Sequence, residues 1–276
     1  MKIPVALTIA GSDPSGGAGI QADLKTFAAH RVYGVSAITA LTVQNTQGVQ
    51  EVFPVEPYQV RAQILHLLAD IPVQAVKLGM LGVTAVIQTV AEVLDGNIPL
   101  VLDPVMLSSS GKPLLERSGI EIMVRQLFPK ALLVTPNLAE AGVLAGRSVT
   151  NREEMFQAAR TIAGLGPKAV LVKGGHLSGE AEDILYYQKD YMTFSSERQT
   201  NPNTHGTGCT YASAIAANLA LGLPLAESIG RAKTYITGAI AAGLEIGKGP
   251  GPTNHFFRMY GDEQKSEVTG QNPEFL

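Results

Sequence analysis

The chain has 276 residues, of which 45% are hydrophobic and 16% charged, and its formal net charge is −3. This composition is typical of a compact α/β protein, and the small net charge without a basic stripe argues against nucleic-acid binding. A single cysteine excludes an intrachain disulfide framework and favours a reducing, cytoplasmic location. The first apolar run ends in Gly-Ser-Asp-Pro, so we expect a strand there and not a signal peptide, and no apolar stretch is long enough to predict membrane insertion.

Strand-like and helix-like segments alternate from the N-terminus. Short apolar runs predict strands over residues 5–10, 35–43, 75–78, 100–102, 131–134 and 169–172. Between them, apolar residues recur at helical spacing, at Ile20, Leu24, Phe27 and Ala28, at Val60, Ile64, Leu67 and Leu68, and at Val86, Val90, Val93 and Leu94. Thr150 and Glu153 have the spacing of a capping box at the start of a further helix.

The last third of the chain changes character. Residues 184–187 and 191–194, on either side of Lys189-Asp190, predict a β-hairpin at a sheet edge. Helices are expected over residues 208–221 and 225–244, and the first should be buried because it is apolar on nearly every face. No linker divides the sequence. We therefore expect a single domain over residues 1–260 and a flexible polar tail over 261–276.

The alternation of apolar strands and helices predicts an α/β fold with a mostly parallel sheet and helices on both faces. In such sheets, ligands bind beyond the carboxyl ends of the strands. Gly11, Asp103, Pro136 and Lys173 each follow directly after a predicted strand. We therefore expect these residues to gather at one edge of the sheet.

Residues 204–210, Thr-His-Gly-Thr-Gly-Cys-Thr, carry the strongest functional signal. A Gly-x-Gly turn that opens a helix directs backbone N–H groups at one point, where the helix dipole adds positive charge. This arrangement is typical of a phosphate site. Cys209 ends the turn, and a helix N-terminus lowers the pKa of a thiol, which favours a role as base or nucleophile. The alternative is a plain glycine-rich turn with Cys209 as a small core residue.

Two polar segments near the start of the chain point to a flat ligand. The glycine-rich loop over residues 11–19 permits close approach to a ring, although a merely flexible loop is the alternative. Gln44 ends an apolar run, and its carboxamide can both donate to and accept from a heteroaromatic edge. The alternative for Gln44 is a turn residue that satisfies the local backbone.

Polar residues later in the chain point to phosphate and Mg²⁺. Asn137 and Glu140 have capping-box spacing, and the same pair suits a hydrated Mg²⁺ near phosphates; both interpretations can hold together. Lys173, before two glycines, can reach a phosphate or be an ordinary surface lysine. His176 and His205 are expected to be structural or peripheral, because no metal-ligand spacing links them.

Together these segments resemble the hydroxymethylpyrimidine/phosphomethylpyrimidine kinases of thiamine biosynthesis, which belong to the ribokinase-like superfamily. The resemblance covers about residues 5–257 and rests on the glycine-rich segment from Ala10 to Lys25, Gln44-Asn-Thr, Leu102-Asp-Pro-Val-Met, Thr135-Pro-Asn-Leu-x-Glu, Lys173-Gly-Gly-His and His205-Gly-Thr-Gly-Cys. It implies a ribokinase-like fold and a homodimer. It also implies that MgATP phosphorylates 4-amino-5-hydroxymethyl-2-methylpyrimidine and then its monophosphate, to give the diphosphate.

The resemblance implies a role for each candidate residue. Catalysis falls to Cys209, in the position where ribokinase relatives carry an Asp base, beside an anion hole made by Gly206, Thr207 and Gly208. The pyrimidine site comprises Gln44, which would hydrogen-bond the ring, with Gly11, Asp23, Met80 and Val105. Around the ATP phosphates and Mg²⁺ it implies Lys173, Asn137 and Thr207, with Asp103 and Glu140 for the metal. One departure lies at residues 107–112, where relatives often carry a lysine that Lys112 need not replace.

Two other functions are compatible with the same scaffold. Pyridoxal kinase is the first alternative, but Gln44 favours the aminopyrimidine, whose ring nitrogen and amino group can pair with one carboxamide. A non-catalytic pyrimidine-binding protein is the second. The Gly-Thr-Gly-Cys segment argues against it, because a binding protein needs no site for phosphoryl transfer.

Overall fold

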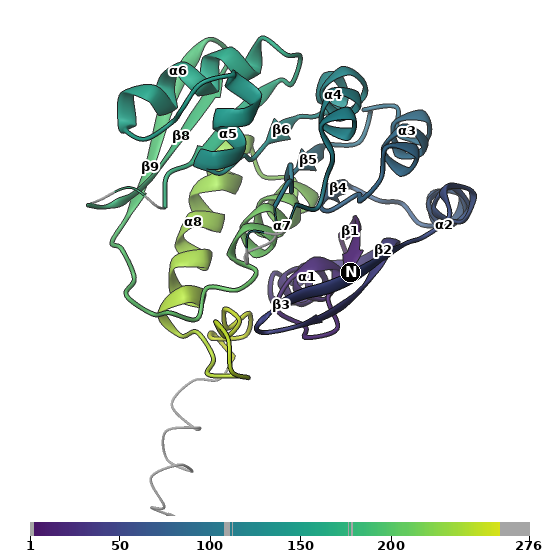
Figure 1. The fold of residues 1–276 in the computed structure, drawn as a ribbon, viewed down its shortest axis with the longest axis horizontal. Coiled ribbons are helices and arrows are strands. Elements are labelled where there is room, and N and C mark those ends of the chain that lie inside the picture. The colour runs from purple at the N-terminus through teal and green to yellow at the C-terminus, as the bar shows by residue number, and fades with distance from the viewer. Residues whose placement is uncertain (1–2, 108–110, 112, 176, 178, 260–276) are drawn as a thin grey trace, which may run out of the picture.

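The computed structural model describes residues 3–259 except 108–110, 112, 176 and 178. Within them the chain forms a nine-stranded sheet in the order β3-β2-β1-β4-β5-β6-β7-β8-β9 (Figure 1). The elements in chain order are β1 (Val5–Ser12), α1 (Gly19–Ala29), β2 (Tyr33–Asn45), β3 (Gly48–Pro54), α2 (Pro57–Asp70), β4 (Ala75–Leu78), α3 (Thr84–Val93), β5 (Leu100–Leu102), α4 (Arg117–Gln126), η1 (Phe128–Lys130), β6 (Leu133–Val134), α5 (Leu138–Ala145), α6 (Arg152–Ala163), β7 (Ala169–Lys173), β8 (Ala181–Tyr187), β9 (Asp190–Ser196), α7 (Thr207–Ala220) and α8 (Leu225–Ala241).

The sheet is parallel at its centre and antiparallel at its margins. Strands β2, β1, β4, β5, β6 and β7 pair in parallel, whereas β3, β8 and β9 join antiparallel. The predicted fold class, a mostly parallel sheet with helices on both faces, is therefore confirmed. The predicted edge hairpin is confirmed as well, as β8 and β9.

At the central strands β1 and β4, side chains of different size cover the two faces of the sheet. Leu7, Ile9 and Leu78 belong to the core beneath α2–α6, whereas Ala6 and Ala75 belong to the core beneath α1, α7 and α8. Figure 1 shows these two helix layers on opposite sides of the strands. Helix α7 is itself rich in buried alanines, as predicted. Small residues on both partners let α7 pack closely on the sheet, and this fixes its N-terminus at the carboxyl edge of the strands.

Some local expectations differ from the structure. Strand β3 was not predicted, because it is exposed along most of its length and therefore lacks the alternation of a half-buried strand. The capping box proposed for Thr150 and Glu153 is wrong: Asn151 is the N-cap of α6, and its side chain accepts from the Glu154 N–H at 3.0 Å. Asn is a stronger N-cap than Thr, so Asn151 and not its neighbour Thr150 begins the helix.

Some expectations fall outside the described residues: the tail over 261–276, most of the 107–112 departure with Lys112, and His176. None of the helices in the part of the chain that the structure describes is both long and apolar enough to cross a membrane.

Candidate functional site

The N-terminus of α7 is built on tight contact between two glycine-containing loops. Gly206 is its N-cap, in the left-handed conformation with φ 78°. A Cβ at Gly206 would overlap with the carbonyl oxygen of Gly17, in the loop between β1 and α1. Only glycine therefore fits at this crossing. The Thr207 hydroxyl donates to the Thr204 carbonyl at 2.7 Å and closes the turn.

Asp103, Lys173 and Glu140 form a charged cluster beside this turn. Lys173 Nζ lies 2.7 Å from Asp103 Oδ1, and a Cβ at Gly208 would be 3.5 Å from both Asp103 Oδ2 and Lys173 Nζ. The residues that follow β5 and end β7 thus meet the first turn of α7, as the sheet-edge argument predicts. Burial opposes the charge of Lys173, but Asp103 and Glu140 together hold its pKa above the ordinary value.

Glu140 has a structural role that the sequence predicted. Its backbone N–H donates to Asn137 Oδ1, and its Oε2 accepts from the Asn137 N–H, both at 2.9 Å, so the capping box of α5 is confirmed. The side chain is also buried, and burial raises the pKa of Glu140 to about 7, against the opposing effect of Lys173. Because the pKa of Glu140 is near neutral pH, a cation that binds beside this carboxyl group would favour its charged form.

Asp103 and Glu140 are better suited to hold a hydrated Mg²⁺ together with phosphate oxygens than to hold a metal ion by protein ligands alone. Within the described residues, no group of three or more His, Cys, Asp or Glu side chains gathers as a metal cage. Mg²⁺ usually keeps several waters and takes one or two carboxylates together with phosphate oxygens. Two carboxylates beside a lysine and a helix N-terminus provide that combination.

We expect Glu140→Gln to change how stability depends on pH. A folded-state pKa of about 7 lies above the ordinary value of 4.5. The wild type should therefore lose up to roughly 3 kcal/mol of unfolding free energy as the pH rises from about 4.5 to 7. The substituted glutamine can still cap but carries no charge, so the variant should not show this loss. Urea unfolding at pH 5 and 7.5 with EDTA measures it.

Glu154→Gln is the matched control for that experiment. Glu154 also caps a helix start, but it is exposed, and hydrogen bonds from Thr150 hold its pKa below the ordinary value. Glu154→Gln should therefore not increase the free energy of unfolding at pH 7.5. If the unfolding free energies of Glu140→Gln and the wild type change by the same amount between the two pH values, burial does not raise the pKa of Glu140.

Cys209 lies in the first turn of α7, as predicted, but its thiol is not activated in the way the sequence suggested. Burial is the largest influence and raises the pKa of Cys209 to about 11, although Lys77 and a hydrogen bond from the Gly19 N–H act in the opposite direction. The expected lowering of this pKa is therefore wrong. Loss of hydration and the nearby carboxylates of Asp23 and Asp103 outweigh the helix N-terminus.

The loop after β1 and the turn before α7 are joined by a hydrogen bond between Asp13 and His205 that sequence reasoning missed. Asp13 Oδ2 lies 2.8 Å from His205 Nε2, and its Oδ1 accepts from both the N–H and the hydroxyl of Ser15. Burial raises the pKa of Asp13, but the bonds from His205 and Ser15 outweigh it and leave the pKa lowered. His205 is therefore structural, one of the two roles expected for it, and not peripheral. The sequence signalled a turn at Asp13-Pro-Ser, but it did not identify the partner of Asp13, because His205 lies 192 positions away along the chain.

Gln44 lies next to the last residue of β2, within reach of the Asp13–His205 hydrogen bond. Its Oε1 accepts from Thr42 at 3.2 Å, and its Nε2 lies 3.5 Å from His205 Nε2. A cavity of about 330 Å³ at the turn between β2 and β3 includes Gln44 in its wall. The local turn and the ligand-facing interpretations of Gln44 are thus both compatible with its position.

The other predicted pocket residues lie at different depths. Gly11 donates its N–H to the Met80 carbonyl at 3.0 Å, and a Cβ at Gly11 would overlap with the Met80 methyl group. Val105 is half-buried, two residues after Asp103. Asp23 is fully buried, so the structure places it beneath the site and not on its surface. Its carboxylate is bonded to Lys77, Thr8 and Ser213.

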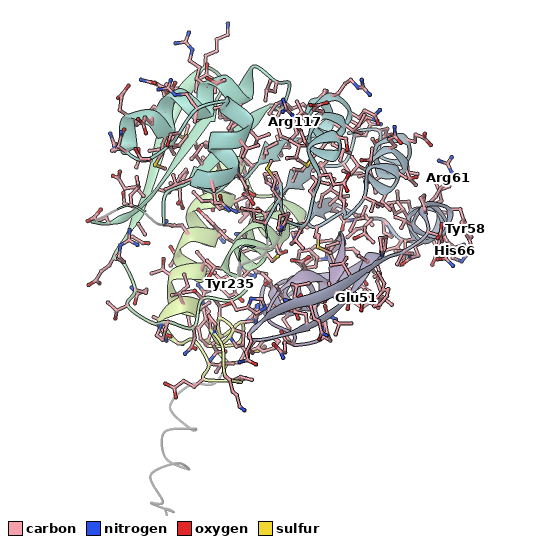
Figure 2. All side chains as sticks on the ribbon, viewed as in Figure 1. Glu51, Tyr58, Arg61, His66, Arg117 and Tyr235 are labelled. Atoms are coloured by element: carbon pink, nitrogen blue, oxygen red, sulfur yellow. The ribbon has the colours of Figure 1, made fainter. Side chains whose placement is uncertain are left out.

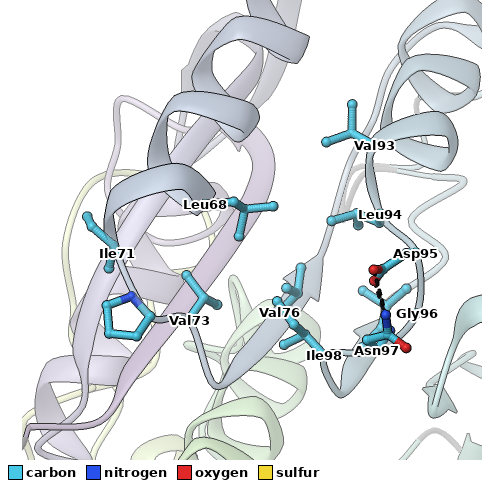
Figure 3. A pocket seen from close by; sticks show the side chains of 12 residues that line it. Leu68, Ile71, Val73, Val76, Val93, Leu94, Asp95, Gly96, Asn97 and Ile98 are labelled. Atoms are coloured by element: carbon cyan, nitrogen blue, oxygen red, sulfur yellow. Dashed lines mark hydrogen bonds between the residues drawn. The ribbon is translucent and has the colours of Figure 1, made fainter.

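A second cavity, of about 280 Å³, lies away from these residues. It is lined by the ends of α2 and α3 and the starts of β4 and β5, so it sits at the opposite, amino edge of the sheet (Figure 3). Its wall is mainly aliphatic. The charged residues described above do not contribute to it.

Comparison with known proteins gives a consistent result. Residues 13–254 match the family described as phosphomethylpyrimidine kinase. The hydroxymethylpyrimidine/phosphomethylpyrimidine kinase of Synechococcus elongatus is 44% identical over 264 residues, 94% of this chain and 100% of that protein. The thiamine biosynthesis bifunctional protein ThiED of Geobacter sulfurreducens is 48% identical over 252 residues, 90% of this chain and 51% of that protein.

Solved structures extend the likeness to the fold. Phosphomethylpyrimidine kinase from Clostridium difficile is 45% identical with a TM-score of 0.76, covering 87% of this chain and 100% of that one. Pyridoxal kinase from Bacillus subtilis, in an ADP complex, is 37% identical with a TM-score of 0.86, covering 94% and 99%.

Proposed function

Because the chain belongs to the phosphomethylpyrimidine kinase family, we propose that it transfers a phosphoryl group from ATP to 4-amino-5-hydroxymethyl-2-methylpyrimidine and then to the monophosphate, in thiamine biosynthesis. The fold is ribokinase-like, as the sequence motifs implied. One observation carries the proposal: the first turn of α7 faces the Asp103–Lys173 pair at Gly208, so an anion site and a charged cluster converge on one point.

The charged cluster and the turn would share the work of holding the phosphates. The N–H groups of Gly206 and Gly208 would receive the transferred group, joined by that of Thr207, which in this structure donates to the Thr204 carbonyl at 3.2 Å. Lys173 would neutralise part of the charge of that group. Asn137 and Thr207 would contact ATP. Asp103 and Glu140 would hold Mg²⁺, which supplies further neutralisation of the phosphate charge when bound. These assignments are supported by the juxtaposition of the side chains at one sheet edge.

Cys209 would be the base that takes the proton from the substrate hydroxyl. It is the single cysteine of the chain and lies next to the anion site. Because burial raises its pKa to about 11, the resting thiol keeps its proton at neutral pH. Proton transfer therefore requires a neighbouring positive charge that favours the thiolate during the reaction.

We propose that Gln44, with Gly11, Met80 and Val105, binds the pyrimidine, and that Asp23 supports that pocket from below. Gln44→Met is expected to raise KM for the pyrimidine by about 5- to 150-fold, because an unmatched buried donor or acceptor costs about 1–3 kcal/mol. KM for ATP should stay unchanged. Gln47→Met, an exposed glutamine in the neighbouring turn, is the control. Wild-type KM values for both phosphorylation steps in the Gln44 variant would refute the assignment.

Pyridoxal kinase is the second candidate function, favoured by the close structural match to the Bacillus subtilis enzyme. A coupled ADP-release assay with the hydroxymethylpyrimidine, its monophosphate and pyridoxal tests both. We expect turnover with the two pyrimidines to exceed turnover with pyridoxal. The opposite order would favour the second candidate, and no ADP release with any of them would favour a binding protein.

We further propose that residues 1–260 act as one kinase domain, in the cytoplasm and as a homodimer. Exposed apolar side chains support association: Leu41, Val43 and Phe53 lie on the β2–β3 hairpin, and Leu41 pairs with Phe53 across the strands. Such a strip is unfavourable in water and suits contact with a second copy of the chain. Light scattering of the purified protein measures the oligomeric state.

A further inference from the structure

A buried ion pair lies directly beneath the candidate site, and apart from the support that Asp23 gives the pocket it has no part in the mechanism described so far. Lys77 of β4 and Asp23 of α1 are both fully buried, and Lys77 Nζ lies 2.8 Å from each carboxylate oxygen of Asp23. Thr8 of β1 and Ser213 of α7 donate to the same carboxylate, each at 2.6 Å. Four elements therefore meet at one carboxylate.

The spacing of these residues connects the pair with the Cys209 thiol. Ser213 follows Cys209 by one helical turn on α7, and Asp23 follows Gly19 by one turn on α1, so each pair shares a helix face. The Gly19 N–H hydrogen-bonds Cys209, and one turn below it Asp23 bonds Ser213. The two contacts fix the N-terminal turns of α1 and α7 against each other.

Stability alone gives a weak reason for this arrangement. In an exposed pair such as Arg61–Glu92 both side chains keep much of their hydration, and Figure 2 shows Arg61 at the outer surface. Lys77 and Asp23 lose all their hydration, and replacing a buried ion pair by apolar residues of similar size is often neutral or stabilising. The pair is therefore better explained by what it does for its neighbours.

The charged groups around Cys209 indicate what the Lys77–Asp23 pair does for its neighbours. Lys77 from β4 and Lys173 from β7 are the positive groups that act on the thiol, and Asp23 from α1 and Asp103 after β5 are the negative ones. Among the charged neighbours, Lys77 has the strongest effect on Cys209. Each lysine is also bonded to one of these carboxylates, Lys77 to Asp23 and Lys173 to Asp103, so the order of their effects on the thiol, and not a missing partner, singles out Lys77. Without Lys77, two carboxylates would oppose formation of the thiolate.

We propose that Lys77 and Asp23 form a positioning pair for phosphoryl transfer, in which Asp23 sets the register of α1 and α7 and Lys77 supplies the positive charge that lets Cys209 release its proton. The role of Cys209 in this inference rests on the proposed function. The effect on the thiol itself does not, because it is a property of the resting protein. Lys77 and Asp23 reach no substrate and act through Cys209.

The single cysteine makes the effect directly measurable, since iodoacetamide can alkylate only Cys209 as a thiol. The rate is measured from pH 7 to 10 in the wild type, Lys77→Met and Lys77→Arg. Loss of a nearby opposite charge typically raises a pKa by one unit or more. We expect Lys77→Met to be alkylated about 10-fold or more slowly at each pH, and Lys77→Arg to recover most of the rate. Lys77→Met alkylated at the wild-type rate would overturn the proposal.

Lys233→Met is the matched control. Lys233 also forms a buried ion pair, with Asp183 of β8 at 2.7 Å, but β5, β6 and β7 separate β8 from β4. It should lose stability without a change in the alkylation rate of Cys209. An equal slowing in Lys233→Met and Lys77→Met would mean that general loosening, and not the charge of Lys77, controls the thiol, and would overturn the proposal.

A fall in kcat without a change in KM would distinguish this positioning role from a merely structural one. In Lys77→Met, kcat should fall about 10- to 100-fold with KM for ATP and pyrimidine nearly unchanged, and Lys77→Arg should restore most of kcat.

If Lys77→Met does not fold, the double variant Lys77→Met/Asp23→Leu removes both charges, and its kcat should still be about 10-fold lower. A folded double variant with wild-type kcat would refute the proposal. If the alkylation result holds but no kinase activity is found in the wild type, the proposed function fails and the inference about the thiol stands.

Discussion

Replacing Cys209 by alanine should slow phosphoryl transfer by about 10²–10⁴-fold, the usual loss when a general base is removed. The proposed anion site at Gly206–Gly208 and the Asp103–Lys173 pair remain, so both substrates should still bind. The expected result is therefore a low kcat with nearly unchanged KM for ATP and the pyrimidine. Single-turnover phosphorylation, with substrate binding measured by calorimetry, checks both parts.

Cys209→Ser distinguishes the base from a packing residue. A serine hydroxyl is similar in size to the thiol but is a poor base at neutral pH, so we expect this variant to be slow as well. If Cys209 only packs, the serine variant should have near-normal kcat and a lower melting temperature. A single-turnover rate near that of the wild type in the folded serine variant would exclude the role as base.

Gly206→Ala should reduce kcat/KM for ATP by about 10²-fold or more. The new Cβ would meet the Gly17 carbonyl oxygen, and backbone atoms cannot turn aside as a flexible side chain can. The two loops would have to separate, which displaces the N–H groups of the anion site, and misplacement by about 1 Å is enough for a loss of this size. Steady-state kinetics over a range of ATP concentrations measures the change.

Gly222→Ala supplies the matched control at the other end of α7. Gly222 has almost the same left-handed backbone, with φ 83° against 78°, but no atom lies within 4 Å of its Cβ position. The alanine should therefore cost about 1–3 kcal/mol of stability through backbone strain and leave the kinetics unchanged. Equal losses of kcat/KM in the two variants would show that strain, and not contact between the loops, explains the effect of Gly206→Ala.

The features that the sequence predicted are those encoded within short segments. Strand and helix positions follow from apolar spacing, and the capping box of Asn137 and Glu140 follows from a separation of three residues. The meeting of Asp103 and Lys173 could be predicted as well, although 70 positions separate them, because parallel strands bring their carboxyl ends to one edge. The exposed strand β3 was missed because pairing with β2, and not its own pattern, defines it.

The sequence by itself thus determined the α/β fold, the motifs and the edge of the sheet where they gather. Only the tertiary structure decided the ionisation of Cys209, since its pKa depends on burial and on charges from β4, α1 and the end of β5. It also decided the depth of Asp23 and the partners of Lys77 and His205, which lie 54 and 192 positions away along the chain. A lysine within the otherwise apolar run at 75–78 was a signal that a partner was needed, but not which one. Electrostatic interactions act through space and depend on local hydration, so they cannot be derived from spacing along the chain.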